Sequence, residues 1–269
     1  MAQSPDITVH CLVRNEERFI RPAIASVLPL AKHVLVYDTG STDATLEVLS
    51  SIQSEKLQIV RKTFSSPSEL TCFRNEMIEL THTEWFMLVD GDELYPAHAV
   101  RRISEEIRTV PPTVHKIAIR RVHFMGSFNF VSRVDSTGRI YRAAKVRWRP
   151  GILPHYRLRA DTEYLVDDPS ATLQAHRILL PEDIFFFHCQ YLARSSKDDE
   201  VGLLRRWRWR KPPFPVVPYF GPWPETLELN GVAHRMTPAL FGAWMGLNVD
   251  ILGKWGLTFA RKVLGRERA

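Results

Sequence analysis

The sequence contains little cysteine, and its three cysteines form no recognisable pair. Cys11, Cys72 and Cys189 are widely spaced in apolar runs, and none belongs to a Cys-x-x-Cys motif. This spacing argues against a disulfide framework and against a zinc or redox pair built from cysteine. We therefore expect three buried thiols in a reducing compartment.

Long apolar runs are missing too. A membrane-spanning helix needs about 18 uncharged apolar residues in a row, and no such stretch occurs. The first residues are polar and lack the basic-then-apolar layout of a signal peptide. We expect a cytoplasmic protein, with peripheral contact at the inner face of a membrane as the alternative. Internal repeats and low-complexity tracts are also absent.

The bulk composition is that of an ordinary globular chain. Of the 269 residues, 45% are hydrophobic and 25% are charged, which argues against wholesale disorder. Lysine and arginine outnumber aspartate and glutamate by 36 to 30, giving a net charge of +6. This excess suits an anionic ligand, an anionic membrane surface or nucleic acid, and does not choose among them.

Strand and helix patterns alternate in the first half of the chain. Short apolar runs predict strands at 7–13, 34–37, 57–60 and 85–89, with helical spacing of apolar residues between them. Single-helix crossovers join parallel strands, so this alternation predicts a largely parallel α/β sheet. At 115–124 and at 138–148 the pattern becomes polar–apolar alternation, which predicts antiparallel strands at a sheet edge.

The last third is basic and rich in tryptophan and proline. Residues 197–210 predict a helix carrying several Arg and Trp side chains, and the prolines of 212–224 predict a surface loop or strap. Indole faces stack on sugars and cations attract phosphates or anionic lipids, so this region should contact the acceptor or a membrane. A solvated helix, a nucleic-acid surface and, for 237–264, a core-covering or dimerising helix pair are alternatives.

Polar clusters follow three of the predicted strands. They are Arg14-Asn15-Glu16, Asp38 and Asp90-Gly91-Asp92. In an open α/β sheet the carboxyl ends of the strands form the ligand-binding edge, so these side chains should meet there. Two carboxylates separated by one glycine can hold a hard cation, which relieves their mutual repulsion. The alternative for this last motif is a plain turn, where aspartate and glycine are common.

Four motifs resemble those of the family-two glycosyltransferases with the GT-A fold. They are, in order, Leu12-Val-Arg-Asn-Glu-Glu17, Tyr37-Asp-Thr-Gly-Ser-Thr-Asp43, Arg74-Asn75 and Leu88-Val-Asp-Gly-Asp-Glu93. The resemblance covers roughly residues 6–108 and implies a Rossmann-like, mostly parallel central sheet flanked by helices, with a C-terminal helical and loop extension. We expect a catalytic domain at 1–195, with a nucleotide-sugar half at 6–108 and an acceptor half at 109–195, followed by the extension at 196–269.

The resemblance also implies a donor site. Asp38 would contact the base, and Asp92, with Asp90 in support, would hold Mn²⁺ or Mg²⁺ on the donor diphosphate. His188 would be a further metal ligand, which favours Mn²⁺ because imidazole suits it better than Mg²⁺; a satisfied structural histidine is the alternative. The other expected donor-binding residues are Val13, Arg14, Asn15, Glu16, Gly40, Arg74, Gly91, Arg194 and Lys197. Asn15 as a helix cap and Arg74 as a solvated helix residue are the alternatives for those two.

The catalytic base is the least defined part of the expected site. Many relatives carry His-Glu after the strands that follow the metal motif, whereas this chain has His155-Tyr156 there. His155, Asp161 and Glu163 are the candidate bases, and Asp92 completes the catalytic set through the metal. The expected activity is metal-assisted, inverting transfer of a sugar, UDP-sugar favoured, to a hydroxyl of a glycan or lipid-linked glycan.

Other activities fit the same motifs less well. A dehalogenase-like phosphatase needs its Asp-x-Asp on the first strand, and here the pair follows the fourth. A nucleotidyltransferase should carry a Gly-rich, Arg-containing loop after the first strand, where this chain has no glycine. A non-catalytic nucleotide- or glycan-binding module on the same fold stays open, and nucleic acid is not a favoured partner.

Overall fold

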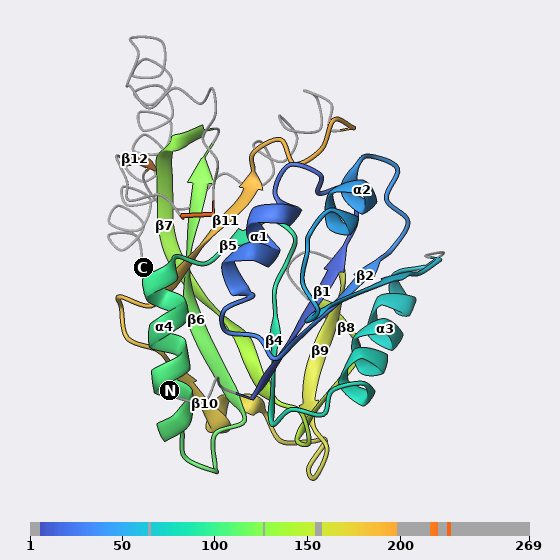
Figure 1. Ribbon diagram of the computed structural model, residues 1–269. Coiled ribbons are helices and arrows are strands. Elements are labelled where there is room, and N and C mark those ends of the chain that lie inside the picture. The colour runs from blue at the N-terminus through green and yellow to red at the C-terminus, as the bar shows by residue number, and fades with distance from the viewer. Residues whose placement is uncertain are drawn as a thin grey trace, which may run out of the picture.

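The computed structural model describes residues 6–63, 66–125, 127–153, 158–197, 216–219 and 225–226. The helices are α1 (Ile20–Val27), α2 (Thr45–Ser50), α3 (Pro67–Glu79) and α4 (Ala97–Glu106), with 3₁₀ turns η1 (Ile107–Thr109) and η2 (Leu173–His176). The strands are β1 (Ile7–Val13), β2 (His33–Asp38), β3 (Leu57–Arg61), β4 (Trp85–Leu88), β5 (Glu93–Leu94), β6 (Lys116–Met125), β7 (Ser127–Arg142), β8 (Val146–Leu153), β9 (Leu158–Leu165), β10 (Arg177–Leu179), β11 (Phe185–Tyr191) and β12 (Val216–Pro218). The expected α/β architecture is confirmed (Figure 1).

A ten-stranded sheet runs through the molecule in the order β3-β2-β1-β4-β7-β6-β11-β5, with β10 beside β6 and β12 beside β7. The first four of these strands are parallel, as their apolar runs and intervening helices predict. Helices α1 and α4 pack on one face of the sheet, where Ile24 and Ile103 join Val9 in the main core. Helix α3 covers the other face, with Met77 against Leu35. Because these strands are parallel, their carboxyl ends lie at one edge of the sheet.

The antiparallel strands lie inside the sheet and not at its edge as expected. Strand β7 pairs antiparallel with β4 on one side and with β6 on the other. Ile140 and Tyr141 pair with both neighbours at once, one on each edge of the strand, and the opposite end of β7 reaches β12. A turn with a hydrogen bond from Lys145 N to Arg142 O (3.1 Å) separates β7 from β8, which divides the predicted run 138–148.

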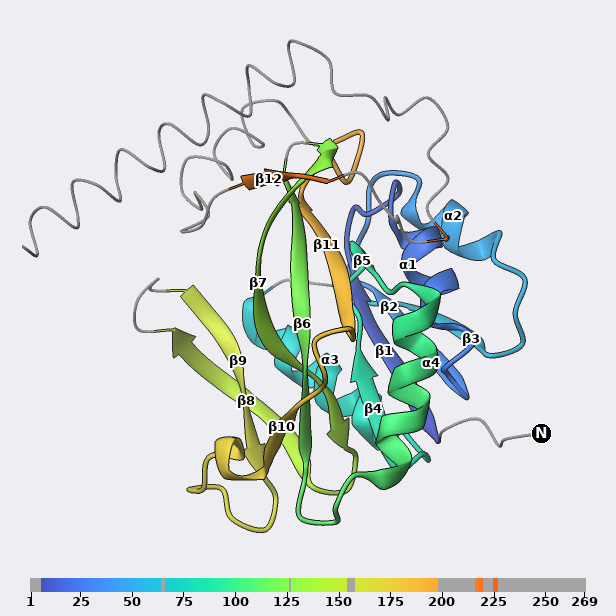
Figure 2. The ribbon, with the colours of Figure 1, turned by 90° about the vertical axis from the view of Figure 1, so that its left-hand side faces the viewer.

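Strands β8 and β9 form a separate two-stranded sheet on the α3 side, opposite α1 and α4 (Figure 2). Asn75 of α3 fixes it: Asn75 Nδ2 donates to Trp148 O (2.8 Å), and Trp148 N donates to Asn75 Oδ1 (2.9 Å). The Trp148 ring is buried with Tyr141 and Phe86 in a second small core. Asn75, part of the Arg74-Asn75 motif, thus has a structural role.

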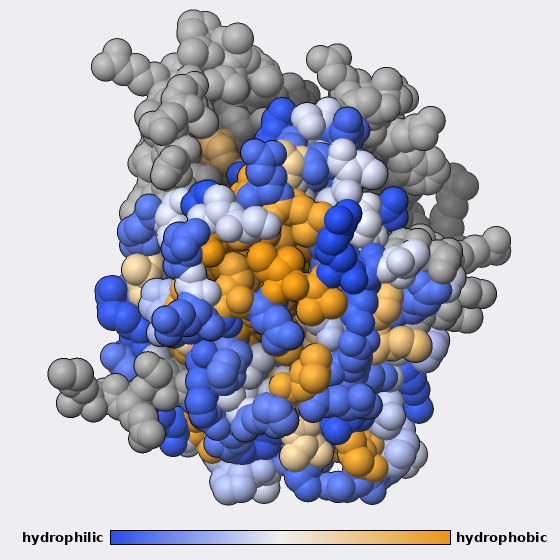
Figure 3. Space-filling view, turned by 45° about the vertical axis from the view of Figure 1, so that its right-hand side comes forward, coloured by the Kyte–Doolittle hydropathy of each residue, from blue (hydrophilic) through white to orange (hydrophobic). Residues whose placement is uncertain are grey.

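Figure 3 shows the molecule with the right-hand side of Figure 1, where α2 lies, turned forward. Apolar side chains gather on this face, and polar residues surround them. Cys11 and Cys189 are buried as expected, but the prediction is wrong for Cys72, which is exposed because α3 packs on the sheet through Met77 and Ile78 instead. Within the described ranges, no helix is long and apolar enough to cross a membrane.

Few residues of the predicted C-terminal extension, 196–269, are described by the structure. The predicted helices at 197–210 and 237–264 lie almost wholly outside the described residues. Within the predicted strap 212–224, Val216–Pro218 forms β12 on β7. Beyond it, Glu225 accepts a hydrogen bond from Ala97 N at the start of α4 (2.9 Å), and Thr226 donates to Pro22 O (3.1 Å). The domain boundary at 195 stays a prediction.

Candidate active site

The carboxyl ends of β1, β2 and β4 meet at one edge, as the sequence predicts. Val13 pairs in register with Asp38, and Thr39 N donates to Val13 O (2.9 Å). The Asp90-Gly91-Asp92 loop packs on the end of β1. A Cβ on Gly91 would lie 2.9 Å from Glu16 Cγ and 3.1 Å from Val13 Cγ2, so only glycine fits there without displacement.

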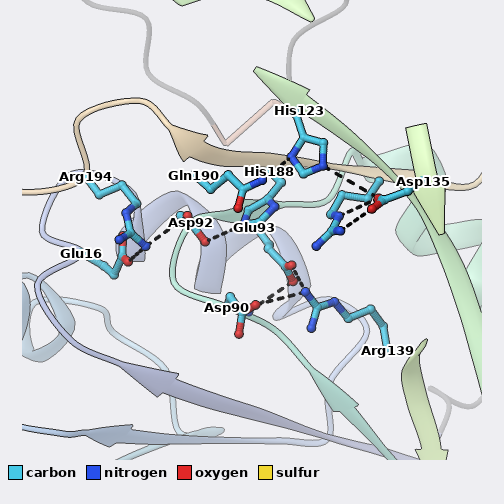
Figure 4. Close-up of polar contacts among 11 residues, drawn as sticks. Glu16, Asp90, Asp92, Glu93, His123, Asp135, Arg139, His188, Gln190 and Arg194 are labelled. Carbon is cyan, nitrogen blue, oxygen red and sulfur yellow. Dashed lines mark hydrogen bonds and ion pairs between the residues drawn. The ribbon is translucent and has the colours of Figure 1, made fainter. Parts of the chain in front are cut away.

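Asp92 is a deeply buried carboxylate at this edge. Its side chain is 2% exposed, with Oδ1 3.4 Å from His188 Nε2 and Oδ2 3.4 Å from Arg194 Nη1 (Figure 4). Burial by itself raises the pKa of Asp92, but the adjacent His188 and then Arg194 outweigh it and lower that pKa to about 2. Asp92 is therefore ionised at neutral pH and faces an imidazole.

Arg194 connects segments that are far apart in the sequence. Its guanidinium bonds to the buried Glu16 as well as reaching Asp92, and its carbonyl accepts from Arg18 N (3.1 Å). The segment after β11 is thereby tied to the loop between β1 and α1. This brings Arg194 and Glu16, both predicted, to the Asp92 carboxylate; Lys197 lies exposed farther along the same segment.

Asp90 makes different contacts. Its side chain is 41% exposed, and Oδ2 accepts from Arg139 Nη2 (3.0 Å). The same nitrogen bonds to Glu93, whose Oε2 accepts from Asp90 N (3.2 Å). Burial by itself raises the pKa of Asp90. The charge of Arg139, and then that of Arg74, outweighs burial, so the pKa of Asp90 lies below its usual value. Neither Arg139 nor Glu93 was predicted as a site residue; Glu93 closes the Leu88–Glu93 motif, and Arg139 is an arginine within an alternating strand.

The metal expectation can be tested against the donor groups present. Two carboxylates and an imidazole are suitable ligands for Mn²⁺, and the buried Nδ1 of His188 has no hydrogen-bond partner among the described residues. Over the same ranges no group of three His, Cys, Asp or Glu is close enough to hold a metal ion. The donor chemistry fits, whereas Asp90 is turned toward Arg139.

A second polar group, also missed by the sequence analysis, continues the edge toward β7. The His123 ring lies 5.1 Å from that of His188, its Nε2 is 3.8 Å from Asp135 Oδ1, and its Nδ1 is 3.1 Å from Gln190 Nε2. Arg121 makes two hydrogen bonds to Asp135, at 2.8 and 2.5 Å. Burial opposes ionisation of Asp135, but His123 and Arg121 hold its pKa far below the usual value.

The loop after β2 is ordered by its own polar groups. Asp38 is 0% exposed and accepts from Gly40 N (3.2 Å) and Ser41 N (3.1 Å). Gly40 has φ +93° and Asn15 has φ +56°, the left-handed region. Asn15 Oδ1 accepts from Thr42 N (2.8 Å), so Asn15 caps this loop and not α1. Contact of Asp38 with a base stays a prediction.

The remaining predicted residues divide between the edge and other places. Arg74 lies over the Trp148 ring (5.5 Å), and its charge acts on Asp90. Arg14 is exposed directly after β1. Glu163 forms an ion pair with Lys116, which begins β6, whereas His188 pairs beside the other end of β6, about 20 Å along the strand. His155 lies outside the described residues, as does the side chain of Asp161.

The sequence model described as "Glycosyl transferase family 2" matches residues 8–158. SunS, a glycosyltransferase of Bacillus phage SPbeta, is 27% identical over 109 residues, which are 40% of this chain and 25% of SunS; the prophage-derived SunS of Bacillus subtilis (strain 168) matches equally. The chain thus spans about a quarter of the length of these curated relatives.

Solved structures resemble the chain more distantly. S. aureus TarS 1–349 gives a TM-score of 0.47 at 17% identity, covering 68% of this chain and 60% of TarS. The mannosyltransferase PcManGT from Pyrobaculum calidifontis, in complex with GDP-Man and Mn²⁺, gives 0.37 at 19% identity, covering 44% and 36%. The family match covers more than half of the chain and includes every motif at the β1, β2 and β4 ends, so this protein belongs to glycosyl transferase family 2.

Proposed function

We propose that this protein transfers a sugar from a nucleotide-diphosphate donor, with a UDP-sugar favoured, to an acceptor hydroxyl of a glycan or lipid-linked glycan. The observation that carries the proposal is the contact of His188 with Asp92, in the loop that also carries Asp90 at the carboxyl edge of the sheet, in a chain of this family. Two ionised carboxylates and a buried imidazole at such an edge suit a metal-bound diphosphate.

On this proposal Asp90, Asp92 and His188 hold Mn²⁺, or Mg²⁺ in its place. A bound divalent cation would stabilise the charge of the departing nucleotide diphosphate. The chain supports such an ion by keeping both carboxylates ionised, since nearby basic side chains lower the pKa of Asp90 and of Asp92 despite burial. To contact a cation, Asp90 has to present the oxygen that Arg139 does not bind.

The donor nucleotide would lie across the ends of β1 and β2. Asp38 offers a carboxylate to an N–H of uracil or guanine, and Arg74 offers a planar donor group. Asn15 and Gly40 shape the loop, while Val13 and Gly91 allow the two loops to approach closely. The other proposed donor contacts are Arg14, Glu16, Arg194 and Lys197. Arg194 and Lys197 would close over the diphosphate from the segment after β11.

An inverting transfer needs a base that removes the acceptor proton as the hydroxyl attacks the anomeric carbon. His155 and Asp161 are the proposed candidates. Glu163 is disfavoured because Lys116 already occupies its carboxylate. The acceptor would lie on the side of β6, β7 and β11, with the basic C-terminal extension contributing to its binding or to peripheral contact with a membrane.

Nucleotide release tests the proposal. Purified protein is incubated with a panel of UDP-sugars and GDP-sugars, with Mn²⁺ or with a chelator, and free nucleotide is measured. We expect slow, metal-dependent hydrolysis of one donor class. Binding without any release would favour the non-catalytic module. Pyrophosphate release from a nucleoside triphosphate and a sugar phosphate would favour a nucleotidyltransferase.

A further inference from the structure

One buried ion pair beside the site has no part in the proposed reaction. The Glu93 side chain is 0% exposed and the Arg139 side chain is 9% exposed, and the two are in direct contact. Charged groups so deeply buried are rare unless they are paired. Their location at the metal motif, and not elsewhere in the sheet, suggests a function beyond stability.

The pair holds Asp90 at two points. Glu93 Oε2 accepts from the backbone N–H of Asp90 (3.2 Å), and Arg139 Nη2 donates to Asp90 Oδ2 (3.0 Å) while also bonding Glu93. A closed ring of contacts therefore runs from the backbone of Asp90 through Glu93 and Arg139 to its own carboxylate. Figure 4 shows one Asp90 oxygen directed at Arg139 and the other directed away.

The pair also lies in the interior of the sheet. Arg139 belongs to β7, at the register shift between Gly138 and Ile140, and its guanidinium lies over the Phe186 ring (5.5 Å). Glu93 belongs to β5 and pairs in register with His188 of β11. Glu93 thus connects the strand that carries His188 to the loop that carries Asp90.

We propose that Glu93 and Arg139 are positioning residues that fix the Asp90 carboxylate for the divalent cation. The inference rests on the proposed function, because it assumes that Asp90 is a metal ligand. Groups that hydrogen-bond to a metal ligand orient it, and their loss typically weakens metal binding about 10- to 100-fold. An Asp90 side chain that is 41% exposed would otherwise turn freely in solvent.

A double substitution tests this. The variant Glu93→Gln/Arg139→Gln replaces both charged groups with neutral side chains, so it removes the contacts that hold Asp90 at its backbone N–H and at its carboxylate. The control is Glu84→Gln/Arg142→Gln, an ion pair between the residue that precedes β4 and the last residue of β7. Mn²⁺ affinity in the presence of UDP is measured from the electron paramagnetic resonance signal of free Mn²⁺, and circular dichroism confirms folding.

We expect the site variant to bind Mn²⁺ about 10- to 100-fold more weakly and the control to bind like the wild type. In an Asp90→Asn background the same double substitution should cause no further loss, because its effect passes through Asp90. Equal losses in both backgrounds would overturn the inference, since a purely structural pair acts independently of Asp90.

Two outcomes separate the inference from the function beneath it. If the wild type binds Mn²⁺ and the site variant binds equally well, positioning by Arg139 is wrong and the metal site stands. If the folded wild type binds no Mn²⁺ with either nucleotide, both are wrong. Should the double variant not fold, Arg139→Lys replaces it: lysine keeps a cation for Glu93 but is shorter, so Mn²⁺ affinity should fall about tenfold, and an unchanged affinity would overturn the inference.

Discussion

The Nε2 atom of His188 lies 3.4 Å from Oδ1 of Asp92, although the two residues are far apart in the sequence. Strand pairing causes this contact: β11, which carries His188, is hydrogen-bonded to β5, which follows the Asp90-Gly91-Asp92 loop directly. The second half of the sheet therefore places the imidazole of His188 beside the Asp90-Gly91-Asp92 loop. The proposed donor site depends on both halves of the chain.

Replacing Asp92 with alanine should abolish transfer while the protein stays folded. Arg194 keeps its contact with Glu16 in this variant, so no guanidinium is left unpaired. Loss of a group that organises charge stabilisation at the departing diphosphate lowers turnover by about 100-fold or more. Asp167→Ala, an exposed carboxylate paired with Lys145, is the control. Substantial donor turnover by Asp92→Ala would remove the basis of the metal assignment.

Replacing His188 with asparagine should change which metal the site prefers. Asparagine offers an oxygen in place of the imidazole nitrogen, and oxygen ligands suit Mg²⁺ whereas imidazole favours Mn²⁺. We expect the ratio of Mn²⁺- to Mg²⁺-supported turnover to fall about tenfold, as for loss of a metal-site group. His115→Asn, which alters a histidine stacked on His176, serves as the control. An unchanged ratio would mean that His188 is structural.

The edge where the carboxyl ends of β1, β2 and β4 meet was predictable, because it follows from the local sequence pattern of apolar strands and polar residues. Apolar strands followed by Asp38 or by Asp90-Gly91-Asp92 indicate where parallel strands end, and parallel strands end together. Arg139 and Glu93 could not be found this way. Their contact exists only because β7 inserts between β4 and β6, a pairing of distant segments on which the local sequence is silent.

Replacing Asn75 with alanine should lower stability. Its side chain makes two hydrogen bonds to the Trp148 backbone, which join α3 to the β8–β9 sheet. Loss of two such bonds costs about 1–3 kcal/mol of unfolding free energy. Urea titration followed by tryptophan fluorescence measures this, with Gln58→Ala on an exposed strand position as the control. Equal stability of the two variants would show that Asn75 does not hold the two-stranded sheet.

Acid should destabilise the protein through His10. This histidine is buried, stacks on Phe86 and bonds Thr81 (2.7 Å), and burial lowers its pKa from 6.5 to about 3. The unfolded chain takes up a proton below pH 6.5, but the folded chain does so only near pH 3, so stability falls as pH drops through that window. At pH 5 the loss is about 2 kcal/mol relative to neutral pH.

The variant His10→Gln has no proton to bind at this position, so its unfolding free energy should change about 2 kcal/mol less than that of the wild type between pH 7.5 and pH 5. Urea unfolding at the two pH values measures both proteins. His33→Gln, at an exposed position on β2, should behave like the wild type. Parallel pH profiles for wild type and His10→Gln would contradict the buried neutral state of His10.

The candidate base marks the limit of prediction from sequence. Glu163 has suitable chemistry, and nothing in the sequence shows that Lys116 occupies it, because that ion pair joins β6 to the separate β8–β9 sheet. Asp38 is a similar case: its place at the end of β2 was predicted, but its complete burial under the loop backbone was not. In both cases the missing information is which long-range contacts the carboxylate already makes.

The central claim is that Asp90, Asp92 and His188 bind a nucleotide diphosphate through a divalent cation. Calorimetric titration of UDP and of GDP, each with and without Mn²⁺, tests it most directly. The account predicts binding of one nucleotide, UDP favoured, that requires Mn²⁺ and is lost in Asp92→Ala. Equal binding with and without the metal, or no binding of either nucleotide by the folded protein, would contradict it.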